Sequence, residues 1–587
     1  MATQPNRDPI LFDVIRNALV QATEEMAIAL RRSAYSTNIK TRNDYSCAFF
    51  NRRLETVAQA LGQPNHLSAF EHLVPVAIRR HGAEQLGPHD MLVTNEPYPG
   101  GAHLNDITLI APVHHDGALL GYVANLAHHV DVGGGAPASV GAFREVFQEG
   151  IIIPPVKLVT NGRIAADVFD LILAQIRSKR ETAGDFRAQI AANNSGIRAL
   201  SALVARYGVD VVAFYMDELI AYAGHRTRAA VELLPRGTFT AEASVDNDGF
   251  TDRPVRLVVA VTIDEKGMLF DFTGAEPQRR APVNSTFGQT FSACAYVLKS
   301  LVGPDVPVNA GFYRFVRVTA PPGTTANCTP PAPVVGGWET AARVTDLVFK
   351  ALAPALPKRV PAGTKAMICH VGFGGLDPRT GEYYCFLETI GGGYGGRHNS
   401  DGPDAVQVHG QNTENAPIEE TERNYPVRIV RYELVNDSDG PGRLRGGLGL
   451  RRDYWFAEGG ATFTILADRD RAGPWGLFGG RAGRRAEYVL NPDREARSLG
   501  SKTTIELQQG DVVSYRTCGG GGYGPAEERD PDRVLRDVRE RKVSVARARE
   551  IYRVAVDTDA WTLDKAETAR LRNDGGRTTR VRTSDAG

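Results

Sequence analysis

The order of helix-like and strand-like segments predicts an α+β fold with several domains. Residues 165–234 carry mainly helical periodicity, whereas the alternation at 255–263 and 268–272 is typical of sheet. Beyond residue 425, short strand-like runs are separated by glycine turns, until a final helical pair at 531–556. Because helices and strands are grouped rather than regularly alternating, we expect mixed sheets with helical insertions.

The N-terminal segments are predicted from caps and periodicity. A helix is expected over 8–33, because an Asp-Pro pair opens it and apolar residues then recur at helical spacing. A strand is expected at 44–50, a second helix at 66–80 and a further strand at 91–95.

The middle of the chain is predicted to return to helices before the last sheet region. Helices are expected at 287–301 and 339–352, followed by a proline-rich link and two strands that end at Ile390. A chain of 587 residues is long enough for two or three domains. We expect three, with these limits: 1–235 with the helical segment, 236–425 as a central α+β domain, and 426–587 as a β-rich domain with terminal helices.

The composition excludes several classes of function. With 68 basic and 68 acidic residues the net charge is zero, which gives no electrostatic reason to expect nucleic acid or a membrane surface as partner. No apolar run approaches the ~20 residues that span a bilayer, and no signal pattern opens the chain, so we expect a cytoplasmic protein. The six cysteines form no Cys-x-x-Cys pair and are expected to be reduced and mostly buried.

Two glycine tracts, 391–396 and 519–524, formally fit the G-x-G-x-x-G pattern. A dinucleotide site needs a helix directly after the glycines, and both tracts run into loop instead. No Gly-Lys dipeptide is present, which excludes a P-loop. We therefore expect no nucleotide-binding site on this chain, and interpret the tracts as tight turns near an active site or a subunit contact.

A β-hairpin is predicted at 107–127, with an Asp-Gly turn signal at its centre. If the hairpin is centred on Gly117, Asp106 lies opposite His128. Directly opposed residues share a face of the sheet, with their Cβ atoms ~5 Å apart, a spacing suited to one divalent cation. His129 follows His128 and is expected to point to the other face.

Two further residues complete the candidate metal site. His103 lies in a glycine-rich bend that is free to turn it inward, and Asp44 opens a strand. Asp44 is either a fourth ligand or a turn residue. Two histidines and one carboxylate with an open position are typical of catalytic metal sites. The alternative is a set of buried histidines satisfied by the backbone.

These motifs resemble the hydantoinase B/5-oxoprolinase family, to which the alpha subunit of acetone carboxylase is related. The resembling segments occur in the same order along nearly the whole chain. They are Asp44-Tyr45-Ser46-Cys47-Ala48, residues 95–108, residues 127–134, residues 148–157, Asp271-Phe272-Thr273-Gly274, residues 391–396, residues 415–419, residues 445–449 and residues 519–524.

The resemblance implies a metal site at His103, Asp106 and His128, with Asp44 as an addition. Zn²⁺ and Mn²⁺ both suit this mixed ligation. His129 or Asp131 is expected to accept or relay a proton.

The resemblance also implies a partner subunit of the hydantoinase A type, an ATPase that holds ATP and Mg²⁺ and phosphorylates the substrate's carbonyl oxygen. A heterotetramer or larger complex is expected. The activity implied is ATP-dependent hydrolysis of the C–N bond of a cyclic amide: a hydantoin, 5-oxoproline or another lactam.

Two alternatives stay open at this point. In a ketone carboxylase subunit, the same metal would polarise bicarbonate or an enolate; the alpha subunits of acetone carboxylase are considerably longer than this chain, which favours the amidase. In a non-catalytic scaffold, the chain would only bind and regulate its ATPase partner.

Overall fold

The computed structural model describes residues 7–98 and 100–581, with side chains up to residue 573. The first helix, α1 (Pro9–Ser33), matches the predicted one. Asp8 is its N-cap and accepts the backbone N–H of Ile10 at 2.8 Å. Capping satisfies a donor that has no partner inside the helix, which is why the helix begins here.

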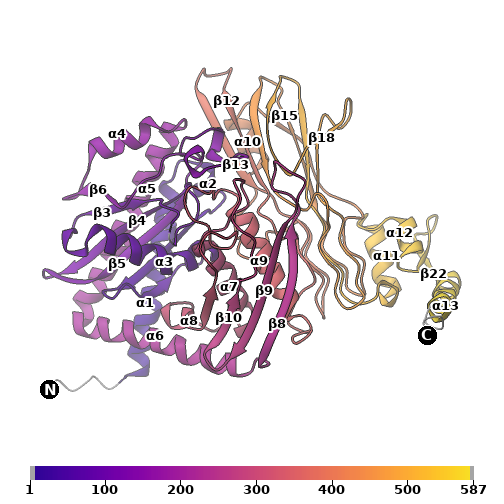
Figure 1. The fold of residues 1–587 in the computed structure, drawn as a ribbon, viewed down its shortest axis with the longest axis horizontal. Helices are drawn as coiled ribbons and strands as arrows, with labels where there is room; N and C mark the ends of the chain where they lie inside the picture. Colours follow the sequence, from indigo (N-terminus) through magenta and orange to yellow (C-terminus); the bar gives the residue numbers. More distant parts are fainter. Residues whose placement is uncertain (1–6, 99, 582–587) are drawn as a thin grey trace.

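A seven-stranded sheet in the order β2-β1-β5-β4-β3-β6-β7 forms the N-terminal part. Apolar residues of α1, α5 and α6 cover one face, and those of α3 cover the other. Figure 1 shows this part in indigo and purple. The strands are β1 (Tyr45–Asn51), β2 (Thr56–Gln59), β3 (Met91–Thr94), β4 (Asp106–His115), β5 (Ala118–His128), β6 (Val156–Thr160) and β7 (Arg163–Ile164). The helices are α2 (Thr37–Lys40), α3 (Pro64–His81), α4 (Ala166–Ala174), α5 (Lys179–Tyr207) and α6 (Val209–Glu232).

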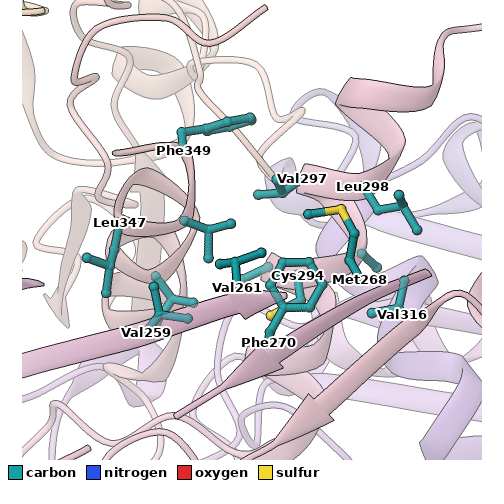
Figure 2. Close-up of a cluster of buried hydrophobic side chains, with 14 of the residues drawn as sticks. Val259, Val261, Met268, Phe270, Cys294, Val297, Leu298, Val316, Leu347 and Phe349 are labelled. Carbon is teal, nitrogen blue, oxygen red and sulfur yellow. The ribbon is translucent and has the colours of Figure 1, made fainter. Parts of the chain in front are cut away.

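A four-stranded sheet in the order β11-β10-β9-β8 forms the central part, where β10 and β11 run parallel. Two helices bury apolar side chains against it. Figure 2 shows Cys294, Val297 and Leu298 of α7 and Leu347 of α9 in one cluster with side chains of the strands. The elements are β8 (Gly237–Val245), β9 (Val255–Asp264), β10 (Gly267–Asp271), α7 (Phe287–Val302), α8 (Ala310–Tyr313), β11 (Val316–Thr319) and α9 (Gly337–Leu352).

Two sheets share a core in the C-terminal half, in the orders β13-β12-β16-β19 and β14-β15-β20-β17-β18. The elements are β12 (His370–Leu376), β13 (Tyr383–Thr389), α10 (Ile418–Asn424), β14 (Arg428–Leu434), β15 (Leu450–Trp455), β16 (Ala461–Leu466), β17 (Glu487–Leu490), β18 (Arg497–Ser498), β19 (Lys502–Leu507) and β20 (Val512–Arg516). Because β12 pairs with β16, one sheet spans the predicted limit at residue 425. The three domain limits stay a prediction.

The chain ends in a small helical subdomain (Figure 1, yellow). The predicted helical pair is α11 (Pro531–Arg539) and α12 (Val545–Glu550), followed by the hairpin of β21 (Ala555–Asp557) and β22 (Thr562–Asp564) and by α13 (Lys565–Val581). Short helical turns lie at η1 (Ala83–Gln85), η2 (Pro137–Ser139), η3 (Val146–Gln148) and η4 (Ala526–Glu528).

The two glycine tracts pack against each other, backbone to backbone. A Cβ on Gly393 would lie 2.0 Å from Gly520 N, and a Cβ on Gly520 would lie 2.0 Å from Tyr394 O. Gly396 donates its N–H to Gly521 O at 2.8 Å. The glycines are therefore required by close approach of two chain segments.

All six cysteines are free and buried, as the sequence predicts. Within residues 7–98 and 100–581, no single helix is long and apolar enough to cross a membrane. Helices α5 and α6 pass such a test only when joined, and the chain bends by 113° between them.

A prediction concerns Glu71 on α3. Burial raises its pKa to about 7, even though Thr56 Oγ1 donates a 2.7 Å hydrogen bond to it. A carboxyl whose pKa is higher in the folded chain loses its stabilising contribution as pH rises from 4.5 to 7. We expect Glu71→Gln to match the wild type near pH 4.5 and to be more stable by about 3 kcal/mol at pH 8.

The measurement is thermal or urea unfolding of both proteins across this pH range, with the exposed Glu84→Gln as matched control. Parallel pH profiles for the wild type and Glu71→Gln would contradict the assignment.

Candidate metal centre

The hairpin has the predicted register. Asp106 of β4 pairs with His128 of β5, at the open end of the hairpin. The register shifts by one residue between Val113 and His114, next to a turn in which both Asp116 and Gly117 have positive φ. A two-residue turn of this kind suits the twist of the flanking strands, and the irregularity absorbs the difference from the simple register.

Three side chains converge at this end of the hairpin. His103, Asp106 and His128 each offer a ligand atom, and these atoms lie within 4.8 Å of one another. All three residues are at least 96% buried, since their exposed fractions are 1%, 3% and 4%. Both ring nitrogens of His103 and Oδ1 of Asp106 are buried without a hydrogen-bond partner. Buried polar atoms without partners are costly, so their gathering indicates a ligand that completes them.

The loop that carries His103 is held by close backbone contacts. A Cβ on Gly101 would lie 2.1 Å from Glu96 O, and a Cβ on Gly288 would lie 2.3 Å from Gly100 O. Thr286, the N-cap of α7, donates its hydroxyl to Gly101 O at 2.6 Å. The bend predicted for this segment is therefore fixed between residue 96 and the start of α7.

Asp106 is surrounded by donors. Trp338 Nε1 lies 3.3 Å from its Oδ2, and His66 Nε2 lies 3.4 Å from its Oδ1. His103 Nε2 lies 3.3 Å from Oδ2, which is an ion-pair distance. Asp44 is not among the three mutually close residues, but its Oδ1 is 3.8 Å from His66 Nε2 and its backbone O accepts the N–H of His128. Asp44 thus lies beside the cluster, and its role as fourth ligand stays a prediction.

Burial and neighbouring charges shift the pKa values of the three cluster residues in different directions. Burial alone would raise the pKa of Asp106, but the charges of His103 and His66 outweigh it and hold that pKa well below its usual range. Burial acts to lower the pKa of His103, and Asp106 overcomes it, so the net direction is upward. Burial, reinforced by the charge of His103, lowers the pKa of His128 well below its usual value. Asp106 therefore favours its ionised form and His128 its neutral form, the forms that bind metals, whereas a metal at His103 would have to displace a proton that Asp106 stabilises.

The ring of His128 is held from the outside by α2. Asn38 Nδ2 lies 3.3 Å from His128 Nδ1, and Asn38 Oδ1 accepts a 3.0 Å hydrogen bond from Arg42 Nη1. Arg42 is fully buried and also donates to Leu387 O of β13 at 2.8 Å. This chain of contacts links the imidazole to the C-terminal sheets. Asn38 Nδ2 is the donor to His128 Nδ1 in this arrangement, whereas a ligand histidine generally donates its second ring N–H.

His129 and Asp131 are not brought into the cluster. His129 lies on the opposite face, where its Nε2 is 2.9 Å from Gln189 Oε1 and its ring contacts Phe186. Asp131 Oδ1 accepts from Arg177 Nη1 at 2.9 Å. Their predicted part in proton transfer stays a prediction, and these contacts give it no support.

Sequence reasoning did not connect four neighbours to the cluster, although His370 lies in a glycine-rich segment that could approach it. His66 and Trp338 contact Asp106 as described, and their rings lie 6.3 Å apart. His370 Nδ1 lies 3.3 Å from Glu339 Oε1, and its ring is 6.4 Å from that of His103. His66 lies in the first turn of α3 and Glu339 in the first turn of α9, so only the packing of these helices against the hairpin reveals them.

A second group of acidic residues differs from the candidate metal centre because arginine and lysine side chains lie against it. Asp246, Asp468 and Asp470 also have oxygens within 4.8 Å of one another. Arg343 Nη2 lies 3.0 Å from Asp246 and 2.9 Å from Asp468, and Lys502 Nζ lies 3.3 Å from Asp468. These cations pair with Asp246 and Asp468, so the group joins the central and C-terminal parts as an ion-pair network.

Comparison with known proteins identifies the family. Residues 8–526 match the family model described as hydantoinase B/oxoprolinase. The chain belongs to this family. It is 38% identical over 571 residues to an uncharacterised protein of Methanocaldococcus jannaschii, covering 96% of this chain and 100% of the relative. It is 32% identical to the B-type subunit of a putative D-/L-hydantoinase from a Pseudomonas strain, covering 96% and 98%.

Two solved structures share the fold of this family member. The ATP-dependent caprolactamase from Pseudomonas jessenii superposes with a TM-score of 0.89 at 29% identity, covering 97% of this chain and 100% of that one. The nucleotide-free acetone carboxylase superposes with a TM-score of 0.90 at 19% identity, covering 99% and 84%. The mixed multidomain fold predicted from the sequence is thereby confirmed.

The His103 loop generates a prediction. We expect Gly101→Ala to lower the free energy of unfolding by about 2 kcal/mol or more, because its Cβ would meet Glu96 O at 2.1 Å. Thermal unfolding measures the effect. Gly500→Ala is the matched control, since nothing lies within 4 Å of a Cβ there. Equal melting temperatures for the two variants would show that the loop is free to shift.

Proposed function

We propose that this chain is the metal-dependent subunit of an ATP-dependent cyclic amidase, which hydrolyses the C–N bond of a cyclic amide activated by phosphorylation in an ATPase partner subunit. The observation that carries the proposal is the buried cluster of His103, Asp106 and His128, in which both ring nitrogens of His103 and Oδ1 of Asp106 lack hydrogen-bond partners, in a hydantoinase B/oxoprolinase family member. The likeness to caprolactamase over 97% of the chain supports a lactam as the substrate class.

The donor set fits a divalent cation. Two imidazole nitrogens and one carboxylate match the mixed ligation of Zn²⁺ and Mn²⁺. We assign ligation to His103, Asp106 and His128, with Asp44 as fourth residue. The orphaned atoms of His103 and Asp106 would then gain a partner, which removes the cost of burying them.

The residues of the chain prepare the site for attack on a poor electrophile. When bound, a divalent ion lowers the pKa of a coordinated water and so supplies hydroxide near neutral pH. Trp338 donates to Asp106 Oδ2, and Asn38 contacts the ring of His128. Burial of the whole set excludes bulk water, which protects an activated substrate from uncontrolled hydrolysis.

A partner of the hydantoinase A type accounts for the activation step. Phosphorylation of the carbonyl oxygen converts an amide into an imidate-like phosphate with a good leaving group. The glycine tracts that resemble nucleotide motifs are packed against each other in the described residues, which supports placing ATP and Mg²⁺ on the partner. We propose a heterotetramer or larger assembly.

Metal content is the first test. The complex purified with its partner should carry about one divalent ion per copy of this chain, measured by inductively coupled plasma mass spectrometry. His128→Ala should lose most of it, because one of three close ligands is removed. His115→Ala is the matched control on the same hairpin. Full occupancy in His128→Ala would overturn the ligand assignment.

Turnover is the second test. With partner, ATP and a panel of lactams and hydantoins, we expect cyclic-amide-dependent ADP release and a ring-opened amino acid. His128→Ala should reduce product formation roughly a hundredfold or more, since the hydrolytic step loses its site. ATP hydrolysis that requires a ketone and bicarbonate would identify a carboxylase instead. Unchanged turnover in His128→Ala would leave only the scaffold alternative.

A further inference from the structure

Glu149 is a buried carboxyl outside the three residues of the candidate metal centre. It follows the helical turn η3 and is 1% exposed. Its Oε1 accepts two backbone N–H groups, from Val334 at 2.7 Å and from Val335 at 2.9 Å. Its Oε2 is buried and has no hydrogen-bond partner among the described residues. One oxygen is therefore anchored, and the other is left without the donor that a buried carboxyl oxygen requires.

The segment that carries Glu149 packs beside the loop that carries His103. Asn95 Nδ2 donates to Leu104 O at 2.8 Å and to Ile151 O at 2.9 Å. The residue after His103 and the second residue after Glu149 therefore meet at a single amide group. This contact places the two side chains in neighbouring segments, although they are far apart in the sequence.

The backbone that anchors the carboxyl is tied to the same loop and to the candidate metal centre. Tyr98 lies in the loop and donates its hydroxyl to Ala332 O, just before the two N–H groups that hold Glu149. Trp338 follows those N–H groups in the chain, and its Nε1 lies 3.3 Å from Asp106 Oδ2. The carboxyl, the loop and a ligand residue are thus held by one set of hydrogen bonds.

His103 has a second ring nitrogen that lacks a partner. Its Nε2 lies 3.3 Å from Asp106 Oδ2 and so faces the candidate metal centre, whereas its Nδ1 is buried and makes no hydrogen bond within the described part of the chain. Burial acts to lower the pKa of His103, and the charges of Asp106 and Glu149 both act to raise it. Burial raises the pKa of Glu149 to about 8, and the charge of His103 acts against that shift. An unpartnered donor and an unpartnered acceptor therefore lie within electrostatic reach of each other.

We propose that Glu149 is the positioning residue of His103: its Oε2 accepts the Nδ1–H of the ring, directly or through one water molecule, so that Nε2 is free to bind the cation. This inference rests on the proposed metal site and deepens it. A ligand histidine generally donates its second ring N–H to a carboxylate or carbonyl, which fixes the tautomer and the orientation of the ring. At His128 the amide of Asn38 lies against Nδ1 instead. His103 is thus the histidine ligand for which the chain supplies a carboxylate.

The anchoring of Oε1 makes Glu149→Gln a sharp test. In the variant, the carbonyl oxygen of the glutamine must accept from Val334 and Val335, because an amide nitrogen cannot accept a hydrogen bond. The NH₂ group then takes the place of Oε2 and presents a donor to His103 Nδ1. A neutral ring must answer with its lone pair on Nδ1 and its proton on Nε2, the nitrogen that the cation needs. The variant keeps the size and the backbone hydrogen bonds of the side chain but selects the wrong tautomer.

Metal affinity of the purified full chain is the measurement, with Zn²⁺ followed by competition with a chromophoric chelator and Mn²⁺ by electron paramagnetic resonance. Glu149→Gln should bind both cations about tenfold more weakly than the wild type, or weaker still. Without metal it should melt at the temperature of the wild type, because its backbone contacts are kept. Glu71→Gln is the matched control: burial also raises the pKa of Glu71, but this carboxyl accepts from Thr56. The control should bind both cations as the wild type does.

The role of Glu149 alone is overturned if Glu149→Gln binds both cations as tightly as Glu71→Gln while His128→Ala loses them. A weaker affinity that comes with a lower melting temperature of the metal-free variant also counts against it, since it indicates a structural role. Metal retained by His128→Ala, or absent from the wild type, overturns the proposed ligand set and this inference with it.

A crystal structure of the metal-loaded wild type tests the contact without any variant. Glu149 Oε2 at hydrogen-bond distance from His103 Nδ1, or from one water bound to both, supports the proposal. Any other partner for His103 Nδ1 contradicts it.

Discussion

Cross-strand pairing between β4 and β5 is the constraint on which the candidate metal centre depends. A shift by one residue would carry Asp106 away from His128 and to the other face of the sheet. The register is set by the two-residue turn at Asp116 and Gly117 and by apolar residues buried on both faces of the sheet. The chemistry of the site is therefore fixed by packing that extends over the whole N-terminal part.

Charge balance distinguishes the two groups of close ligand atoms. Among the described residues, the cluster of His103, Asp106 and His128 has one carboxylate, neutralised only by imidazoles, and it keeps buried atoms without partners. In the Asp246 group, Arg343 and Lys502 supply the positive charge from within the chain. Proximity of acids alone does not indicate a metal. A carboxylate that no arginine or lysine neutralises is the property that leaves room for one.

The sequence predicts those features that local rules determine. The N-cap and period of α1, the Asp-Gly turn and the pairing of Asp106 with His128 follow from neighbours a few residues apart. His66, Trp338 and Glu339 could not be found in this way, because tertiary packing brings them to the hairpin from helices that begin about 40 residues before it and about 210 residues after it. The pairing of β12 with β16 joins distant segments for the same reason.

The contact between the glycine tracts has a consequence for biosynthesis. Gly393 and Gly396 reach their hydrogen-bond partners Cys518 and Gly521 only after the chain has been made through residue 521. After residues 391–396 have been made, the ribosome must therefore add well over a hundred more residues before the two glycine tracts can pair. During this interval the N–H groups of Gly393 and Gly396 lack these acceptors and must be satisfied by water or by another partner.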